Sequence, residues 1–511
     1  MVTATPLSTI IALARAGALD HAWARFSAAG YDRSDDDPAA LTVKGRLLKD
    51  HALRASGEER RLFYLRSAEA YRRSAALQPA TYPLINAATL SLLSGDRGRA
   101  EEIALEVLQR IEREPDEPET PYWRAATEAE ALLLLGRTEE ARAALETAVA
   151  AAPRAWEDHA STLRQFLIIQ DALGGETGWL DRLRPQRSLH YAAAADRAPG
   201  GDREPALAAI LDEEDVGFGY GSLAAGAEIA IAEALIERGA ALHVVLPSDS
   251  ESFAEAFVDP AGQDWRRRFD ALIEAADTVD HVRPLRTLPD ERMAALAREV
   301  ALGAAMLNAE RLMGEGVALR VGAAEPALRI RARVVEAPAA EEKAPTIAAA
   351  LRTEPLALLA LSIGEGGEEA FQDRLEEVGE ALALTGSARI SPHLSGECIL
   401  VGYDDPLAAA AAARALHARL RGRMPLRIAG HYGLVACVRD PFSGSLKPAG
   451  SGTEIALGMA DSIPPDTICV SHDFAAILAA RSSPDEANWI GELQAFDGGS
   501  PIGLYALKRG S

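Results

Sequence analysis

The sequence predicts a multidomain protein of α and α/β type, with an N-terminal α-solenoid, a central α/β domain and a C-terminal α+β domain of ferredoxin-like topology. Residues 1 to about 185 place apolar residues at helical spacing and show no strand-like alternation. Residues 216–247 have the pattern of a glycine-rich turn, a helix and a buried strand. From Pro355 onward, strand and helix patterns follow the order βαββαβ, which predicts an antiparallel sheet backed by helices.

The length of 511 residues is enough for about three domains, each able to bury a core. Residues 1–185 are predicted to form the helical repeats, and residues 186–335 the central domain. Residues 336–349, EAPAAEEKAPTIAA, have the composition of a linker. We therefore assign the linker to 336–350 and the C-terminal domain to 351–511.

The composition indicates a soluble cytoplasmic protein. The formal charge is −23, from 53 Lys and Arg against 76 Asp and Glu, so neither nucleic acid nor an anionic membrane is an expected partner. No apolar run reaches the roughly 18 residues of a membrane span, and the N-terminus lacks the basic segment of a signal peptide. Cys398, Cys437 and Cys469 stand alone in apolar segments, which favours reduced thiols over a metal site or disulfides.

The N-terminal helices contain a repeat. Three glycines are each followed by an alanine five residues later, at Gly17 and Ala22, Gly95 and Ala100, and Gly136 and Ala141. The segment AEALLLLGRTEEARAALETAVAAAP, residues 129–153, and the region around Pro79 resemble tetratricopeptide repeats, although Gly95 and Gly136 are 41 residues apart instead of about 34. The resemblance implies a solenoid that binds a protein partner. Four polar or aromatic residues on apolar faces, either partner contacts or helix caps, are Asn86, Trp156, His159 and Arg164.

A ligand site is predicted in the glycine-rich stretch of the central domain. Ser222 is expected to cap a helix running from about Leu223 to Arg238, and Leu242–Leu246 is expected to be a buried strand. Glycines, free helix amides and the positive end of a helix dipole together favour a phosphate or ribose phosphate. The alternative is that these glycines only allow close packing. The predicted ligand-binding residues are Gly217, Gly219, Gly221, Ser222, Gly226 and Glu228.

The segment GYGSLAAGAEIAIAEALIERGAALHVVLP resembles the central Rossmann-like domain of bacterial proteins that also carry tetratricopeptide repeats and a class III nucleotide cyclase domain. It more distantly resembles nucleotide sensor modules in which a Gly-Ala-Asp segment opens the helix beneath a nucleotide, and Glu228 takes the acidic position here. Around it we expect an edge strand at 188–193, a helix anchored by Trp265 and Phe269, a strand at 278–282 and a helix at 290–312. Residues 313–338 show no clear match to the further strand of the family.

The C-terminal segments SGECILVGYDDPLAAAAAARALHARL and LRIAGHYGLVACVRDPFSGSLKPAGSGTEIALGMADSIPPDTICVSHDFAAIL, with the closing GLYALKR, resemble class III adenylate and guanylate cyclase domains. Such a domain needs two carboxylates for two metal ions, a purine-reading Lys and a transition-state Arg. The resemblance implies that the two carboxylate positions are Ser362 and Glu397, and that the purine-reading Lys position is Asp497. Its Asn and Arg positions become Glu454 and Gly458.

The loss of these groups predicts a pseudoenzyme with no catalytic residues, no metal site and no cofactor. The protein would act in signal transduction as a scaffold that binds a protein partner, senses a nucleotide-like ligand and pairs as a homodimer or with a cyclase. One alternative is a purine nucleotide cyclase with residual activity, using Mg²⁺ or Mn²⁺ held by Glu397 and Glu365. Another is a nucleotide-processing enzyme that uses Glu228 or Glu233 of the central domain.

Overall fold

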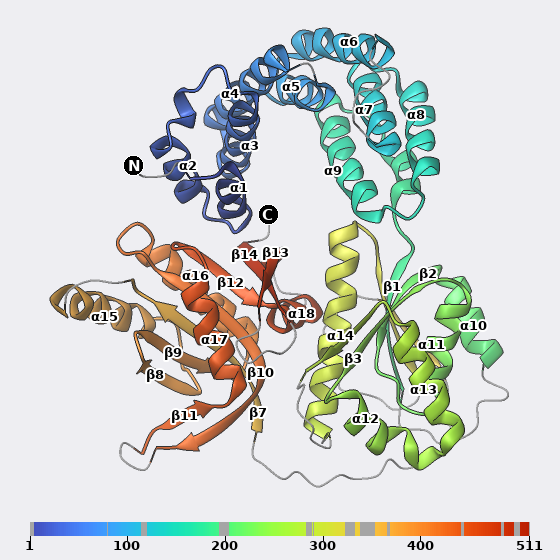
Figure 1. The fold of residues 1–511 in the computed structure, drawn as a ribbon, viewed down its shortest axis with the longest axis vertical. Coiled ribbons are helices and arrows are strands. Elements are labelled where there is room, and N and C mark those ends of the chain that lie inside the picture. The colour runs from blue at the N-terminus through green and yellow to red at the C-terminus, as the bar shows by residue number, and fades with distance from the viewer. Residues whose placement is uncertain are drawn as a thin grey trace. The chain divides into compact units, whose positions relative to one another are not determined.

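The structure is a computed structural model with two compact units, Met1–Pro185 and Gln186–Ser511, which we call the repeat unit and the two-sheet unit and describe separately (Figure 1). The residues described are 5–78, 80–113, 120–193, 204–282, 289, 291–321, 333–337, 353–364, 368–440, 444–481, 485–494 and 501–509.

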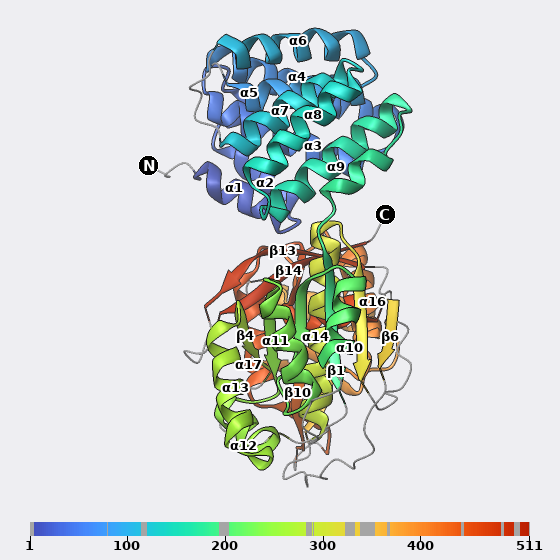
Figure 2. The ribbon, with the colours of Figure 1, turned by 90° about the vertical axis from the view of Figure 1, so that its right-hand side faces the viewer.

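The described residues of the repeat unit are almost entirely helical, as the periodicity predicts. Figures 1 and 2 show the helices stacked along an arch. Caps begin several of them: Asp37 accepts hydrogen bonds from the amides of Ala39 and Ala40 at 2.9 and 3.1 Å. The helices are α1 Leu7–Arg15, α2 Leu19–Ala28, α3 Pro38–Arg54, α4 Gly57–Leu77, α5 Thr81–Leu93, α6 Arg97–Arg113, α7 Pro121–Leu134, α8 Thr138–Ala151 and α9 Trp156–Leu173.

The predicted glycine turns of the repeat are confirmed. Gly95 lies between α5 and α6 with φ 88°, and Gly136 lies between α7 and α8 with φ 73°, a left-handed conformation that favours glycine. Ala100 and Ala141, in the helices that follow, are buried, so each second helix packs closely on the first. Pro79, which marks another repeat in the sequence, lies outside the described residues.

The two-sheet unit begins with a parallel sheet, sheet A, in the order β4-β3-β2-β1-β5-β6. Its strands are β1 Arg187–Ala193, β2 Val216–Gly221, β3 Ala241–Leu246, β4 Thr278–His281, β5 Gly316–Val321 and β6 Arg333–Ala337. Its helices are α10 Glu204–Glu213, α11 Ala227–Glu237, α12 Ser250–Phe257, α13 Gln263–Ala275 and α14 Glu291–Leu312. Trp265 and Phe269 of α13 are buried in its core, as expected.

Helices cover both faces of sheet A, and the side chains of β1 point alternately to one face and the other. Leu189 and Tyr191 pack into the core under α11. Ser188 points to the other face, where its hydroxyl accepts a hydrogen bond from Asn308 of α14 at 3.0 Å. The prediction of 188–193 as an edge strand is therefore wrong in position, since this strand lies between β2 and β5.

Three further sequence predictions in this region are wrong. Residues 216–221 form strand β2 instead of a turn. Helix α11 begins at Ala227 with Gly226 as its N-cap, so Ser222 does not cap it. Residues 316–321 and 333–337, where no strand was assigned, form β5 and β6, and β6 extends into the first two residues of the predicted linker.

The second sheet, sheet B, has the order β13-β14-β12-β10-β7-β9-β8, with β11 paired to β10. Neighbouring strands are antiparallel except β10 and β12. The strands are β7 Thr353–Ser362, β8 Ile390–Ser395, β9 Cys398–Tyr403, β10 Arg427–Arg439, β11 Leu446–Ala449, β12 Thr467–Ser471, β13 Asp485–Leu493 and β14 Ile502–Arg509. The helices are α15 Glu368–Leu382, α16 Pro406–Leu420, α17 Ser451–Ser462 and α18 His472–Ala480.

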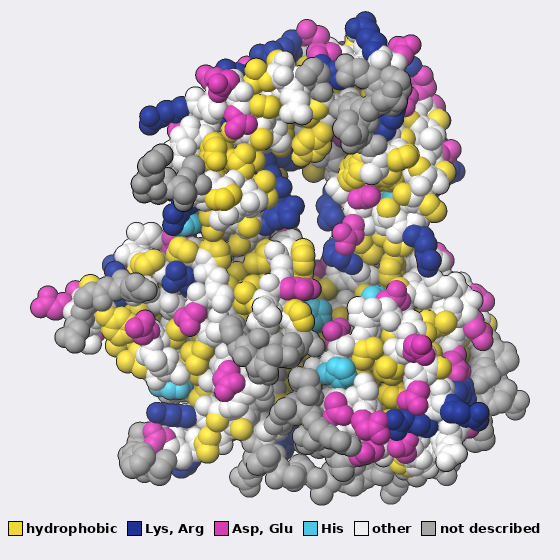
Figure 3. Space-filling view, viewed as in Figure 1, with side chains coloured by type: hydrophobic (Ala, Val, Ile, Leu, Met, Phe, Trp, Pro, Cys, Tyr) yellow, Lys and Arg dark blue, Asp and Glu magenta, His cyan; other side chains and the backbone are white. Residues whose placement is uncertain are grey.

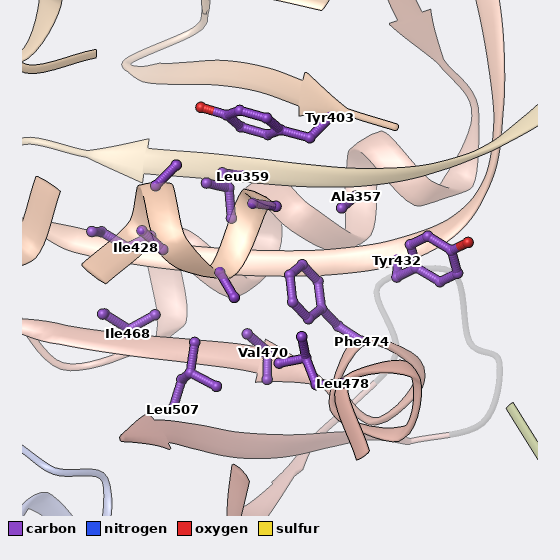
Figure 4. Close-up of a cluster of buried hydrophobic side chains, with 14 of the residues drawn as sticks. Ala357, Leu359, Tyr403, Ile428, Tyr432, Ile468, Val470, Phe474, Leu478 and Leu507 are labelled. Atoms are coloured by element: carbon purple, nitrogen blue, oxygen red, sulfur yellow. The ribbon is translucent and has the colours of Figure 1, made fainter. Parts of the chain in front are cut away.

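Helices cover both faces of sheet B. On one face, Leu359 of β7, Ile428 of β10 and Phe474 of α18 lie in one apolar core with residues of α15 and α16 (Figure 4). On the other face, Leu358 and Met459 belong to a second core beneath α17. Both cores follow from the alternation of side chains along β7.

Helix α14 joins the two sheets, because it covers one face of sheet A and also packs against α18. Gly303 allows the closest approach: a Cβ at this position would lie 1.9 Å from the carbonyl oxygen of Ala476. Glu299 forms an ion pair with Arg481 at 2.6 Å, and Arg292 donates to the carbonyl oxygen of Thr353 at 2.8 Å. These contacts make the two sheets one compact unit.

Candidate functional site

The glycines of the predicted ligand site lie inside strand β2, at positions where a side chain would not fit. A Cβ on Gly219 would lie 2.2 Å from the side chain of Leu235, and one on Gly221 would lie 2.5 Å from the ring of Tyr191. A Cβ on Gly217 would lie 2.6 Å from the side chain of Gln186. These three glycines therefore allow packing of neighbouring side chains against the strand, which is the alternative left open by the sequence.

Ser222, Gly226 and Glu228 do come together, at the carboxyl end of β2 and the start of α11. The Glu228 carboxylate is buried and accepts three hydrogen bonds. We call Glu228 and the groups that donate to it the Glu228 cluster. One oxygen accepts from the Ser222 hydroxyl at 2.7 Å and the Ala224 amide at 2.9 Å, and the other accepts from the Ala193 amide at 3.2 Å. Glu228 thus holds the segment after β2 against the end of β1.

Tyr191 lies beside the Glu228 cluster and was missed by the sequence analysis. Its side chain is 1 % exposed, and its hydroxyl has no hydrogen-bond partner among the described residues. Burial raises the pKa of Tyr191 well above its usual value, and the Glu228 carboxylate acts in the same direction. The sequence showed only that Tyr191 falls near the end of the expected strand 188–193, and the structure was needed to place this strand beside β2, at the carboxyl edge of a parallel sheet.

Glu233, the other carboxylate considered for chemistry in this domain, lies elsewhere. It forms a bidentate ion pair with Arg268 of α13, at 2.5 and 2.7 Å. The Arg268 guanidinium also lies over the ring of Trp265, 4.2 Å from its centroid. Glu233 therefore connects α11 to α13 and does not share a site with Glu228.

In sheet B, the structure brings together Ser362 and Glu397, the two positions that the resemblance to cyclase domains assigns to metal-binding carboxylates. Ser362 ends β7 and is paired in register with Cys398, and Glu397 precedes Cys398 in the turn between β8 and β9. Asp461 of α17, which the sequence analysis did not consider, lies 3.8 Å from the sulfur of Cys398. Burial raises the pKa of the Cys398 thiol to about 11, and Asp461 adds to this effect.

The remaining cyclase-like positions are on α17 or outside the described residues. Glu454 and Gly458 are one turn apart on α17, and Glu454 is exposed to solvent. Asp497 and Glu365 lie outside the described residues. Among the residues that are described, no group of three or more His, Cys, Asp or Glu side chains is arranged to hold a metal ion.

His431 of β10 is a structural histidine. Its Nδ1 lies 3.0 Å from the Ser471 hydroxyl, and the side chain is buried. Burial lowers the pKa of His431 to about 4, so the ring is neutral at pH 7. The neutral ring of His431 forms a hydrogen bond with Ser471, the N-cap of α18, and so supports the packing of this helix.

A group of titratable side chains lies at the junction of the two sheets. Burial raises the pKa of Asp473, at the start of α18, to about 6; His472 opposes this shift and Asp280 of β4 adds to it. The Tyr505 hydroxyl of β14 lies 3.1 Å from His472 Nδ1, and burial raises the pKa of Tyr505 to about 12, with Arg311 opposing this shift. The ionised Asp473 is therefore unfavourable in the folded protein.

We expect Asp473→Asn to stabilise the protein at pH 7–8 by about 2 kcal/mol and to leave its stability unchanged at pH 4. The folded-state pKa lies above the ordinary 3.8 of the unfolded chain, so wild-type stability from this group is present below pH 4 and lost as pH rises through about 6. Urea unfolding of the variant and wild type at both pH values measures the difference. Asp264→Asn, at an exposed position, is the control. An equal effect at the two pH values would contradict the assignment.

Comparisons with known proteins find a match at the N-terminus and similarity of fold elsewhere. Residues 8–91 match the family model described as Tetratricopeptide Repeats-Sensor. A search of curated proteins finds no match. No helix among the described residues is both long and apolar enough to cross a membrane.

The similar solved structures include nucleotide cyclases. The adenylyl cyclase CyaB from P. aeruginosa is 13 % identical, with 31 % of this chain and 96 % of that chain covered and a TM-score of 0.27. An adenylate/guanylate cyclase/hydrolase from Silicibacter pomeroyi is 18 % identical, with 30 % and 97 % covered and a TM-score of 0.26.

Proposed function

We propose that this protein is a non-catalytic cytoplasmic signalling scaffold. In this proposal the repeat unit binds a protein partner, sheet A carries a site for a nucleotide-like ligand, and sheet B is a pseudo-cyclase domain that mediates pairing. The match of residues 8–91 to a family of tetratricopeptide-repeat sensors supports the first part. The three unpaired thiols, Cys398, Cys437 and Cys469, are consistent with a reducing compartment.

The observation that carries the proposal is the pair of residues at the end of β7 and the adjoining hairpin. Ser362 and Glu397 supply one carboxylate between them, where the cyclase reaction needs two to hold its metal ions. Removal of a single electrostatic catalytic group commonly lowers a rate by about 10²–10³. At Gly458, the position of the transition-state Arg also lacks a side chain.

The ligand site we propose on sheet A uses the Glu228 cluster. The strand order places β1 between β2 and β5, the arrangement of a Rossmann-like sheet, in which ligands bind at the carboxyl edge where the strand order reverses. Ser222, Gly226 and Glu228 lie at this edge. The Ala224 amide already donates its hydrogen bond to the Glu228 carboxylate. We therefore propose that the ligand does not bind this amide, and that its hydroxyls, such as those of a ribose, donate hydrogen bonds to the carboxylate.

We expect the full chain to make no cyclic AMP or cyclic GMP from ATP or GTP, with either Mg²⁺ or Mn²⁺. The physical reason is the missing second carboxylate at Ser362, without which two metal ions cannot be held on the triphosphate. Mass spectrometry of the reaction products, with an active class III cyclase as positive control, measures this. Turnover that is detected in the wild type and abolished by Glu397→Ala would overturn the proposal.

A further inference from the structure

A buried histidine in the middle of sheet A has a ring nitrogen that no described residue uses. His190 of β1 is 6 % exposed, and its Nε2 atom has no hydrogen-bond partner among the described residues. The ring forms a hydrogen bond with the backbone of Arg298 on α14, and this bond therefore uses Nδ1. Buried polar atoms in folded proteins nearly always have a partner, so Nε2 is a candidate contact for a bound group.

His190 lies where the strand order of sheet A reverses. Strands β2, β3 and β4 follow one another on one side of β1, and β5 and β6 lie on the other side. Open sheets of parallel strands bind ligands at such a point, outside the carboxyl ends of the strands. Strand β1 ends three residues after His190, at Ala193, so the ring lies within about 10 Å of this edge.

Two arginines lie near the His190 ring. Ser188 faces α14, so the alternation of side chains places His190 and Ala192 on the same face. Arg320 of β5 is paired in register with Ala192, and side chains in register on parallel strands point to the same side. Burial lowers the pKa of His190 to about 3, and the charges of Arg320 and Arg298 act in the same direction, which places both guanidinium groups close to the ring.

The opposite face of the sheet has the opposite charge at this edge. There the Glu228 carboxylate accepts hydrogen bonds from the amides of Ala193 and Ala224, so an anionic group is repelled from the segment after β2. Figure 3 shows a group of Asp and Glu side chains over α12 and α13, the helices that share this face with α11. The α14 face is therefore the side of the sheet edge that favours an anion.

We propose that the α14 face of sheet A, at the carboxyl ends of β1 and β5, binds the phosphate group of a sugar phosphate through Arg320, Arg298 and His190. This inference rests on the proposed ligand site, and it adds a phosphate position on the other side of the sheet from Glu228. The guanidinium groups donate charge-assisted hydrogen bonds to phosphate oxygens, and Nε2 of His190 forms one more bond. A ligand that crosses the end of β1 then has its hydroxyls near Glu228 and its phosphate near Arg320.

The bond between Nε2 and the phosphate requires one proton from solvent. At pH 7.5 a phosphate monoester is mostly a dianion, since its second pKa is about 6. The neutral ring with a proton on Nδ1 offers Nε2 as an acceptor only. Neither atom carries a proton before binding, so one proton is taken up when the two groups form a hydrogen bond.

The other titratable and charged groups around the ring do not supply this proton. They are Arg298 on α14, Arg320 on β5, Tyr220 on β2, which is paired in register with His190, and Glu336 on β6, which is paired in register with Arg320. Arginine stays protonated and glutamate is ordinarily ionised at pH 7.5. Burial raises the pKa of Tyr220 further above its usual value, so its hydroxyl stays protonated too.

The test is a calorimetric titration of the full chain with ribose 5-phosphate, and with ribose as the phosphate-free comparison. We expect ribose 5-phosphate to bind at least about tenfold more tightly than ribose. Its affinity should fall about tenfold or more in Arg320→Met and should be mostly retained in Arg320→Lys. Arg267→Met, at an exposed position of α13 with the same change of charge, is the matched control and should bind as the wild type does.

His190→Leu gives a second measurement. Titrations at pH 7.5 in buffers of different ionisation enthalpy report the protons taken up, and we expect about one proton per bound ribose 5-phosphate in the wild type and about none in the variant. Leucine is close to histidine in volume, and Nε2 has no hydrogen bond to lose among the described residues. The variant should therefore unfold at or near the temperature of the wild type.

Three results would count against the phosphate position. Equal affinities for ribose 5-phosphate and ribose, or an unchanged affinity in Arg320→Met, would overturn this inference and leave the proposed sugar contacts of Glu228 standing. Binding of ribose 5-phosphate without proton uptake would overturn it as well, because Nε2 would not contact the phosphate. If neither compound binds, both this inference and the proposed ligand site on sheet A are wrong.

Discussion

Gly303→Ala should destabilise the two-sheet unit by about 2–3 kcal/mol, although alanine is the better helix former. The added Cβ would lie 1.9 Å from the carbonyl oxygen and 2.2 Å from the carbonyl carbon of Ala476. These are backbone atoms in the middle of α18, so they cannot move aside as the end of a flexible side chain can. Helices α14 and α18 must therefore separate, and the two sheets lose their shared core.

Urea unfolding and hydrogen exchange measured by mass spectrometry test this prediction. Faster exchange is expected in α14 and α18, with no change in the repeat unit. Gly379→Ala, in the exposed interior of α15, is the matched control: nothing lies within 4 Å of its Cβ position, and we expect a gain of about 0.5–1 kcal/mol. Similar stability for both variants would show that the close contact of α14 with α18 does not exist in solution.

Glu228→Gln should lower the stability of the two-sheet unit by about 3 kcal/mol or more. Hydrogen bonds to a charged group are worth about 1.5–3 kcal/mol each, and a buried donor left without an acceptor costs more than the bond itself. Glutamine keeps one acceptor oxygen, which can accept from Ser222 and Ala224, but its NH2 group cannot accept from the Ala193 amide that faces the other oxygen. The segment after β2 should then separate from the end of β1.

The measurement is the urea midpoint, together with exchange of the Ala193 and Ala224 amides, which should lose protection. Glu237→Gln on the same helix is the control, since this side chain is exposed and its replacement should change stability by less than about 0.5 kcal/mol. A Glu228→Gln protein as stable as the control would mean that the carboxylate does not hold these segments. Its place in the proposed ligand site would then lose its support.

The elements that the sequence predicted well are those whose signal is local. In the repeat unit, a glycine ends one helix and an alanine packs the next, and both features occur within a few residues of Gly95 and Gly136. The buried pair Trp265 and Phe269 on α13 depends in the same way on helical spacing.

The glycine-rich stretch shows where local signals were insufficient. Three alternate glycines have the composition of a turn, and Gly219 and Gly221 became strand residues because Leu235 and Tyr191 pack over them. The candidate ligand site changed for the same reason. Ser222, Gly226 and Glu228 remain together at the sheet edge, but the partners of Glu228 come from the ends of two strands, and Tyr191 could be found only once β1 was known to lie beside β2.

The sequence by itself determined the helical N-terminal repeats, several of the strands, the serine at position 362 and the net acidity, because residue identity and near-neighbour spacing encode these properties. Only the tertiary structure decided that β1 is central, that α14 joins two sheets, and that Glu228 meets the amide of Ala193 at the end of β1. Each of these depends on contacts between distant segments, whose energies come from close packing and desolvation that a linear pattern does not contain.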